Sequence, residues 1–168
     1  MKPKVSIIMG STSDLPVMEK AAKVLNDFKI PFEMNELFAH RTPEKVEEFA
    51  REAAGRGIKV IIAAAGMAAH LPGVIAAMTQ LPVIGVPINA SLEGLDSIFS
   101  ILQMPPGIPV ATVGVNAAQN AGILAAQILA VGDEDTASEL AKFKENLKEK
   151  IIAANQELKK VKFEFKTN

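Results

Sequence analysis

The sequence predicts an α/β protein: a doubly wound, three-layer domain of the flavodoxin-like kind, with a five-stranded parallel sheet and a long C-terminal helix. Short runs that are apolar throughout alternate with longer segments of helical periodicity across residues 1–130. Strands that are apolar on both faces are typical of a parallel sheet covered by helices on both sides. The chain has 168 residues, of which 49% are hydrophobic. Residues 1–168 are therefore expected to form a single domain with a sizeable core.

The first predicted strand, residues 5–9, is short, apolar and rich in β-branched side chains. A loop follows, and Ser13 or Asp14 is placed to cap a helix that continues to about residue 28. Pro16 is tolerated because it falls in the first turn, where its missing N–H has no helical partner.

A weaker strand is predicted over residues 30–37, followed by a helix with a clear beginning. Thr42 is the expected cap, with a proline and an acidic residue directly after it. Gly55 and Gly57 are expected to end this helix, and a strongly apolar third strand covers residues 58–65.

The remaining elements of the domain continue the same alternation. They are a helix to about residue 80, a strand at 82–87, a helix at 91–103, a strand at 109–115 and an Ala-rich helix at 116–130. The order of the strands in the sheet does not follow from this pattern.

The last segment differs from the rest, because the sheet domain is complete before it starts. Thr136 and Glu139 have the spacing of a capping box. Apolar side chains then recur at steps of three and four residues: Leu140, Phe143, Leu147, Ile151, Ala154, Leu158 and Val161. This predicts one helix over about 133–160 with a single apolar stripe. The stripe packs either on its own domain or, the favoured interpretation, on a neighbouring subunit.

Composition excludes several classes of protein. The formal net charge is −1, whereas binding to a phosphate backbone requires a basic surface, so nucleic acid is not an expected partner. There is no cysteine, which excludes disulfides and thiolate chemistry. No stretch approaches the roughly 20 apolar residues of a membrane span, and the N-terminus lacks the features of a signal peptide. We expect a cytoplasmic protein without membrane association.

Three loops carry the residues suited to chemistry, and each follows a predicted strand. In a doubly wound sheet, ligands bind beyond the carboxyl ends of the strands. The first loop, residues 10–14, places a glycine and hydroxyls before a helix N-terminus, which is typical of an anion cradle but also of an ordinary capped helix. It matches neither a Walker A loop nor a dinucleotide fingerprint.

The other two loops contain both histidines of the chain. His40 can exchange protons near neutral pH, and the adjacent Arg41 can hold a phosphate or carboxylate. His70 lies in a loop of small residues, 66–73, where a substrate could approach the backbone. Each loop alone also has an ordinary structural interpretation, as a surface ion pair or a helix cap. Their coincidence at one edge of the sheet favours a single site. Two histidines without further ligands are a thin basis for a metal site, and no G-x-S-x-G nucleophile elbow is present.

At these loops the sequence resembles the PurE family in its class I form. The matching segments are MGSTSD (9–14), AHRTP (39–43), AAHLPG (68–73), PVIGVPI (82–88), LEGLDSIFSILQMPPGIPVATV (92–113) and NAGILAAQILA (120–130). They cover nearly all of residues 1–130 in order. Two positions depart from the family pattern: Phe38 stands where serine is usual, and Met67 where glycine is usual. No role is transferred to either.

The resemblance implies an N5-carboxyaminoimidazole ribonucleotide mutase of purine biosynthesis, which moves a carboxyl group from the exocyclic nitrogen to C4 of the imidazole. It implies no metal and no cofactor, an imidazole ribonucleotide as the small-molecule substrate, and a homo-octamer with active sites at subunit interfaces. The implied catalytic residues are His40 and His70. The implied substrate-binding residues are Gly10, Ser11, Ser13, Asp14, Arg41, Gly66, Ala68, Ala69 and Leu71.

Two alternatives remain open. One is the class II activity, direct carboxylation of aminoimidazole ribonucleotide by CO2. The other is a nucleotide-binding regulator on the same scaffold with no catalysis.

Overall fold

The computed structural model describes residues 1–168, and its centre is a five-stranded, all-parallel sheet with the strand order β2-β1-β3-β4-β5. The strands are β1 (Val5–Met9), β2 (Phe32–Glu36), β3 (Val60–Gly66), β4 (Val83–Ile88) and β5 (Ala111–Thr112). The α-helices are α1 (Leu15–Asp27), α2 (Pro43–Arg56), α3 (Leu71–Met78), α4 (Leu95–Leu102), α5 (Ala118–Ala130) and α6 (Glu134–Lys160). The predicted α/β class, parallel sheet and flavodoxin-like arrangement are confirmed.

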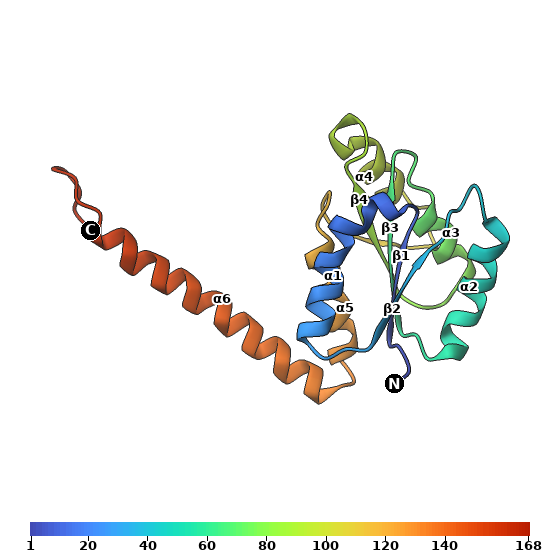
Figure 1. The fold of residues 1–168 in the computed structure, drawn as a ribbon, viewed down its shortest axis with the longest axis horizontal. Coiled ribbons are helices and arrows are strands. Elements are labelled where there is room, and N and C mark those ends of the chain that lie inside the picture. Colours follow the sequence, from blue (N-terminus) through green and yellow to red (C-terminus); the bar gives the residue numbers. More distant parts are fainter.

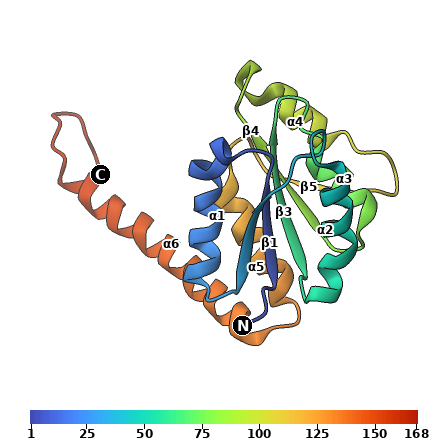
Figure 2. The same ribbon diagram turned by 45° about the vertical axis from the view of Figure 1, so that its right-hand side comes forward.

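Helices cover both faces of the sheet (Figures 1 and 2). Adjacent residues of β1 show why the strands are apolar throughout. Ile7 packs in the core that the sheet shares with α1 and α5, whereas Ile8 packs in the core shared with α2 and α3. Both side chains are fully buried, because successive side chains of a strand point to opposite faces.

The strand order places a switch point between β1 and β3. The chain leaves β1 to pair β2 on one side of it, and later returns to pair β3 on the other side. In this arrangement the loops after β1 and β3 diverge and leave a crevice at the carboxyl edge of the sheet. Two of the three predicted loops follow these two strands.

Two predicted elements are shorter than expected. The fifth strand pairs with β4 only at Ala111 and Thr112, not over 109–115, since Pro109 has no N–H to donate and Asn116 turns the chain with φ 55°. The helix predicted at 91–103 begins only at Leu95. Before it, Leu92 and Glu93 adopt positive φ within a 3-10 turn, which breaks the helical path.

The ends of two other helices also differ from the sequence prediction. Gly57, in the left-handed conformation at φ 103°, ends α2. Gly55 instead lies inside the helix. Helix α6 is capped by Asp133, whose carboxylate accepts a hydrogen bond from the Thr136 N–H at 3.0 Å. The predicted capping box was wrong because the helix starts three residues earlier than Thr136 would allow.

Helix α6 projects away from the sheet domain, so that its C-terminal end lies far from the sheet (Figure 1). Its first turns are held by Leu140, which is buried, and by Phe143, whose ring meets Phe28 edge-on with centroids 5.4 Å apart. Beyond them, Ile151 and Leu158 are 65% and 59% exposed. No helix of the protein, including α6, is both long enough and apolar enough to cross a membrane.

Candidate active site

A pocket of about 380 Å³ lies at the switch point, at the carboxyl edge of the sheet. The loops after β1, β2 and β3 meet around it. Its walls include every predicted site residue except Arg41: Gly10, Ser11, Ser13, Asp14, His40, Gly66, Ala68, Ala69, His70 and Leu71. The strand order thus brings three separate loops into one cavity.

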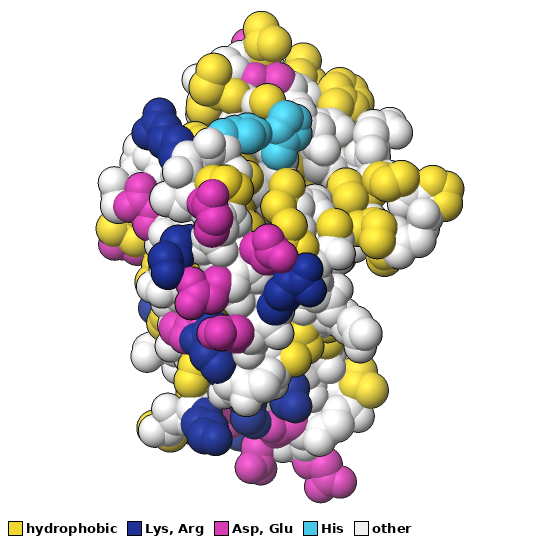
Figure 3. Space-filling view, turned by 90° about the vertical axis from the view of Figure 1, so that its right-hand side faces the viewer, with side chains coloured by type: hydrophobic (Ala, Val, Ile, Leu, Met, Phe, Trp, Pro, Cys, Tyr) yellow, Lys and Arg dark blue, Asp and Glu magenta, His cyan; other side chains and the backbone are white.

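The two histidines are in direct contact in this pocket. Nε2 of His40 lies 2.8 Å from Nδ1 of His70, and the ring centroids are 4.9 Å apart at nearly a right angle. One ring must donate and the other accept, and the tautomers decide which. Both rings are solvent-exposed and adjoin apolar surface (Figure 3). Two groups able to carry protons therefore face the same space.

The loop after β1 forms a 3-10 turn that presents hydroxyls to the pocket. Ser11 caps this turn, since its Oγ accepts a hydrogen bond from the Ser13 N–H at 3.2 Å. The Ser13 hydroxyl donates to the same oxygen at 2.8 Å. Asp14 occupies the N-cap position of α1, one of the two predicted positions, but its side chain makes no capping hydrogen bond there.

Asp14 is instead a buried carboxyl group in the pocket wall, 8% exposed. Burial raises the pKa of Asp14 above its ordinary value, against the opposing effect of the hydrogen bond from Ser13. The nearby charge of Glu36 raises the pKa further. A carboxylate held in this way is a strong acceptor for ligand hydroxyls.

The loop after β3 allows close approach to the backbone. A Cβ added to Gly66 would lie 2.8 Å from Cβ of Ala90, so only glycine fits there. Met67 follows in the left-handed conformation, with φ 55°. Small side chains then continue to His70, which leaves backbone groups accessible from the pocket.

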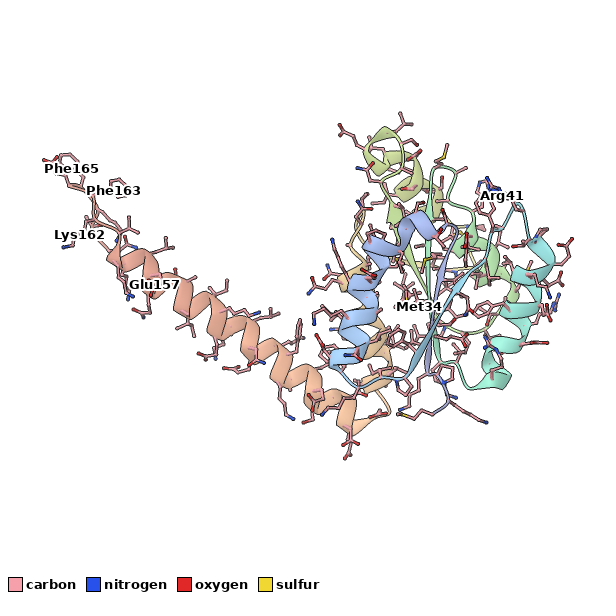
Figure 4. The ribbon with its side chains drawn as sticks, viewed as in Figure 1. Met34, Arg41, Glu157, Lys162, Phe163 and Phe165 are labelled. Atoms are coloured by element: carbon pink, nitrogen blue, oxygen red, sulfur yellow. The ribbon has the colours of Figure 1, made fainter.

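Arg41 is the one predicted residue that does not line the pocket. Its guanidinium carbon lies 4.5 Å from the centroid of the Phe38 ring, near the beginning of α2 (Figure 4). Thr42 occupies the N-cap position of α2, as predicted, but its side chain does not cap the helix. The Thr42 hydroxyl instead donates to the Phe38 carbonyl and accepts from the Phe38 N–H.

Phe38 and Met67 were left without a role by sequence reasoning, yet both line the pocket. The motif comparison marked them only as departures, because their apolar side chains carry no reactive group. The available signal was their place in the chain, because Phe38 directly precedes the loop of His40 and Met67 lies within the loop of His70. No three His, Cys, Asp or Glu side chains lie together as a possible set of metal ligands.

Comparison with known proteins fits this geometry. Residues 4–150 match the family model of AIR carboxylase. The chain belongs to the AIR carboxylase family. The match thus covers the sheet domain and continues into α6 as far as residue 150.

Curated members of the AIR carboxylase family are very similar to the chain. It is 60% identical to N5-carboxyaminoimidazole ribonucleotide mutase of Pyrococcus abyssi, over 87% of this chain and 84% of the other. It is 54% identical to the protein of the same name from Thermotoga maritima, over 95% and 94%. It is also 54% identical to phosphoribosylaminoimidazole carboxylase of Schizosaccharomyces pombe, but spans only 29% of that longer protein.

Solved structures of this family have the same fold. The crystal structure of a substituted form of Treponema denticola PurE2 superposes with a TM-score of 0.86 at 34% identity, covering 95% of this chain and 100% of that one. Treponema denticola PurE superposes with a TM-score of 0.83 at 32% identity, covering 94% and 99%. The flavodoxin-like arrangement is therefore shared across relatives of moderate identity.

Proposed function

We propose that the protein is an N5-carboxyaminoimidazole ribonucleotide mutase, an isomerase of purine biosynthesis. The observation that carries this proposal is the contact of His40 with His70 in a pocket whose walls also include two serines, the carboxyl group of Asp14 and several glycines and alanines. The identity of 54–60% to relatives named as this mutase supports it.

The residues in and beside the pocket suit each part of a ribonucleotide: the phosphate, the ribose and the base with its carboxyl group. Ser11, Ser13 and the backbone at Gly10 take the phosphate together with Arg41, since hydroxyls and N–H groups at a helix start bind anions. Asp14 accepts the ribose hydroxyls. His70, with the backbone of 66–69 and the side of Leu71, faces the carboxyl group that is moved.

The reaction is a decarboxylation followed by a carboxylation at another atom. The bond between the exocyclic nitrogen and the carboxyl carbon breaks, CO2 is released, and the nitrogen keeps the electron pair and takes a proton. C4 then attacks CO2, a carbon–carbon bond forms, and the C4 proton leaves. In the net reaction one carboxyl group moves from the exocyclic nitrogen to C4, and one proton moves from C4 to the exocyclic nitrogen.

His40 carries that proton in this proposal. It donates to the departing nitrogen and removes the proton from C4, and such general acid–base help is worth roughly 10²–10⁴-fold in rate. Retaining CO2 beside the ring adds the advantage of proximity. Phe38 and the small residues of the loop after β3 line the space in which CO2 would be held.

We further propose that the protein acts in the cytoplasm as a homo-octamer with its sites at subunit interfaces. The chain leaves two apolar surfaces uncovered. One is the stripe of α6, which is followed, beyond the end of the helix, by the exposed rings of Phe163 and Phe165 (Figure 4). The other is on α4, where Phe99 is 57% exposed. Surfaces of this kind mark contacts between proteins, and a second copy of the chain offers the same apolar surfaces.

The decisive experiment offers the purified protein two substrates. One is the carbamate ribonucleotide, and the other is 5-aminoimidazole ribonucleotide with bicarbonate. A mutase converts the first far more efficiently. A strong preference for the second would instead identify a carboxylase, the alternative that the name of the Schizosaccharomyces pombe relative favours. Binding without turnover of either would identify a regulator.

A further inference from the structure

The contact between Phe38 and Arg41 has no part in the proposed reaction. We propose that Phe38 is a positioning residue, whose ring holds the Arg41 guanidinium beside the pocket and so sets the affinity for the ligand phosphate. This rests on the proposed function only in taking the ligand to be a ribonucleotide.

The backbone of residues 38–42 brings the two side chains together. The Phe38 carbonyl accepts hydrogen bonds from the Arg41 N–H at 3.2 Å and from the Thr42 N–H at 2.8 Å. The Thr42 hydroxyl closes the same turn by donating to that carbonyl at 3.1 Å. This tight turn places the Phe38 ring and the guanidinium in contact, 4.5 Å from centroid to carbon.

The Phe38 ring is the only partner that the structure gives to the Arg41 side chain. No carboxylate lies within ion-pair distance of Arg41, and its guanidinium makes no hydrogen bond within the chain. Arg56 provides the contrast. It also lies over a ring, that of Phe49 at 5.3 Å, but two of its N–H donors bind Glu33 at 2.9 Å each.

This difference matters because a stacked guanidinium contacts the ring through its face. Its N–H donors lie around the edge of the plane and remain free for an anion. Phe38 thus restricts the motion of Arg41 without occupying the donors that a phosphate needs. The same ring lines the pocket and lies 5.9 Å from the His40 ring, so it connects the anion-binding residue to the proton-carrying one.

The test measures binding of 5-aminoimidazole ribonucleotide, its dephosphorylated nucleoside and ribose 5-phosphate by calorimetry. Phe38→Leu should weaken binding of both phosphorylated ligands about two- to fivefold, the size of an exposed cation–π contact. Binding of the nucleoside should not change. Phe38→Tyr, which keeps the ring, should restore the affinity, and Phe49→Leu is the matched control that should leave it unchanged.

A second comparison separates positioning from a simple wall. In an Arg41→Ala background, Phe38→Leu should have no further effect on phosphate-dependent binding. The proposal would be overturned if Phe38→Leu weakened binding of nucleoside and nucleotide equally, or if it had no effect on binding. It would also be overturned if Phe38→Leu weakened phosphate-dependent binding just as much in the Arg41→Ala background.

The outcomes also separate this proposal from the proposed function. Phe38-dependent binding of ribose 5-phosphate, without turnover of either substrate, would leave the role of Phe38 standing and remove the mutase. Mutase activity with phosphate binding indifferent to Phe38 would do the reverse. A protein that binds none of the three ligands would overturn both.

Discussion

Nε2 of His40 lies 2.8 Å from Nδ1 of His70, although the two residues are 30 positions apart in the chain. A hydrogen bond at this distance requires one ring nitrogen to donate and the other to accept. Any role of one in moving protons therefore depends on the other. This coupling can be tested by substitution.

His40→Asn should lower kcat by about 10²–10⁴-fold, because the general acid and base is lost. Binding of 5-aminoimidazole ribonucleotide should stay close to that of the unchanged protein, since the phosphate and ribose contacts remain. Steady-state kinetics and calorimetry measure the two effects. The His40→Asn, His70→Asn double variant should lose little more than the worse single variant, as expected of residues that act as a unit. Fully multiplicative losses would contradict a coupled pair.

Asp14→Asn should make the protein more stable at neutral pH and less able to bind substrate. The pKa of Asp14 is raised by burial. The stabilisation that its protonated form provides is therefore fully present below about pH 3.8 and is lost as the pH rises through the raised pKa. At pH 7 the ionised carboxyl group is a net penalty that asparagine avoids. Thermal unfolding should show a higher Tm for the variant at pH 7, with a difference that shrinks toward pH 4. A lower Tm at pH 7 would show that Asp14 has a structural role instead.

Gly66→Ala should destabilise the protein and impair activity. The added Cβ would lie 2.8 Å from Cβ of Ala90, and overpacking of this kind typically costs about 1–3 kcal/mol. Gly55→Ala is the matched control, because nothing lies within 4 Å of its added Cβ and it is inside α2. Gly55→Ala should raise the free energy of unfolding by roughly 0.4–1 kcal/mol. Chemical denaturation measures the free energy of unfolding of both variants. Similar values for Gly66→Ala and Gly55→Ala would contradict the close contact between residues 66 and 90.

The attachment of α6 should depend on the charge of Asp133. Lys4 donates to its carboxylate at 2.7 Å, and this contact, with the Thr136 N–H, lowers the pKa of Asp133 to about 2. Its stabilisation is therefore present above pH 3.8 and disappears as the pH falls toward 2. Asp133→Asn keeps the capping oxygen and removes the charge. Its Tm should lie below that of the unchanged protein at pH 7 and approach it in acid; a pH-independent difference would argue against the ion pair.

The stripe of α6 should control assembly. Ile151→Lys places a charge in the apolar stripe and should convert the oligomer to smaller species in light scattering coupled to size-exclusion chromatography. Glu149→Lys lies two residues away, about 200° around the helix, and should leave the assembly intact. Monomers from the unchanged protein, or equal effects of both variants, would contradict an interface at the stripe.

Most of the site could be predicted from the sequence because its residues share one local feature. Glycines, hydroxyls and histidines follow strands, and in a parallel sheet every such position lies at the same edge. Arg41 satisfied this rule but does not line the pocket, since the turn at 38–42 stacks it on Phe38. Residue type alone did not indicate a role for Phe38, because an apolar ring has meaning only through what it contacts.

The sequence by itself determined the alternation of buried strands and helices, the separate tail helix and the loops that carry chemistry. These follow from burial periodicity and from hydrogen bonds between near neighbours in the chain. Only the tertiary structure decided the strand order that joins three loops, the contact of His40 with His70, the break before α4 and the ion pair of Asp133 with Lys4. Such features depend on the packing of segments far apart in the chain, where small shifts in register or in a turn decide which side chains meet.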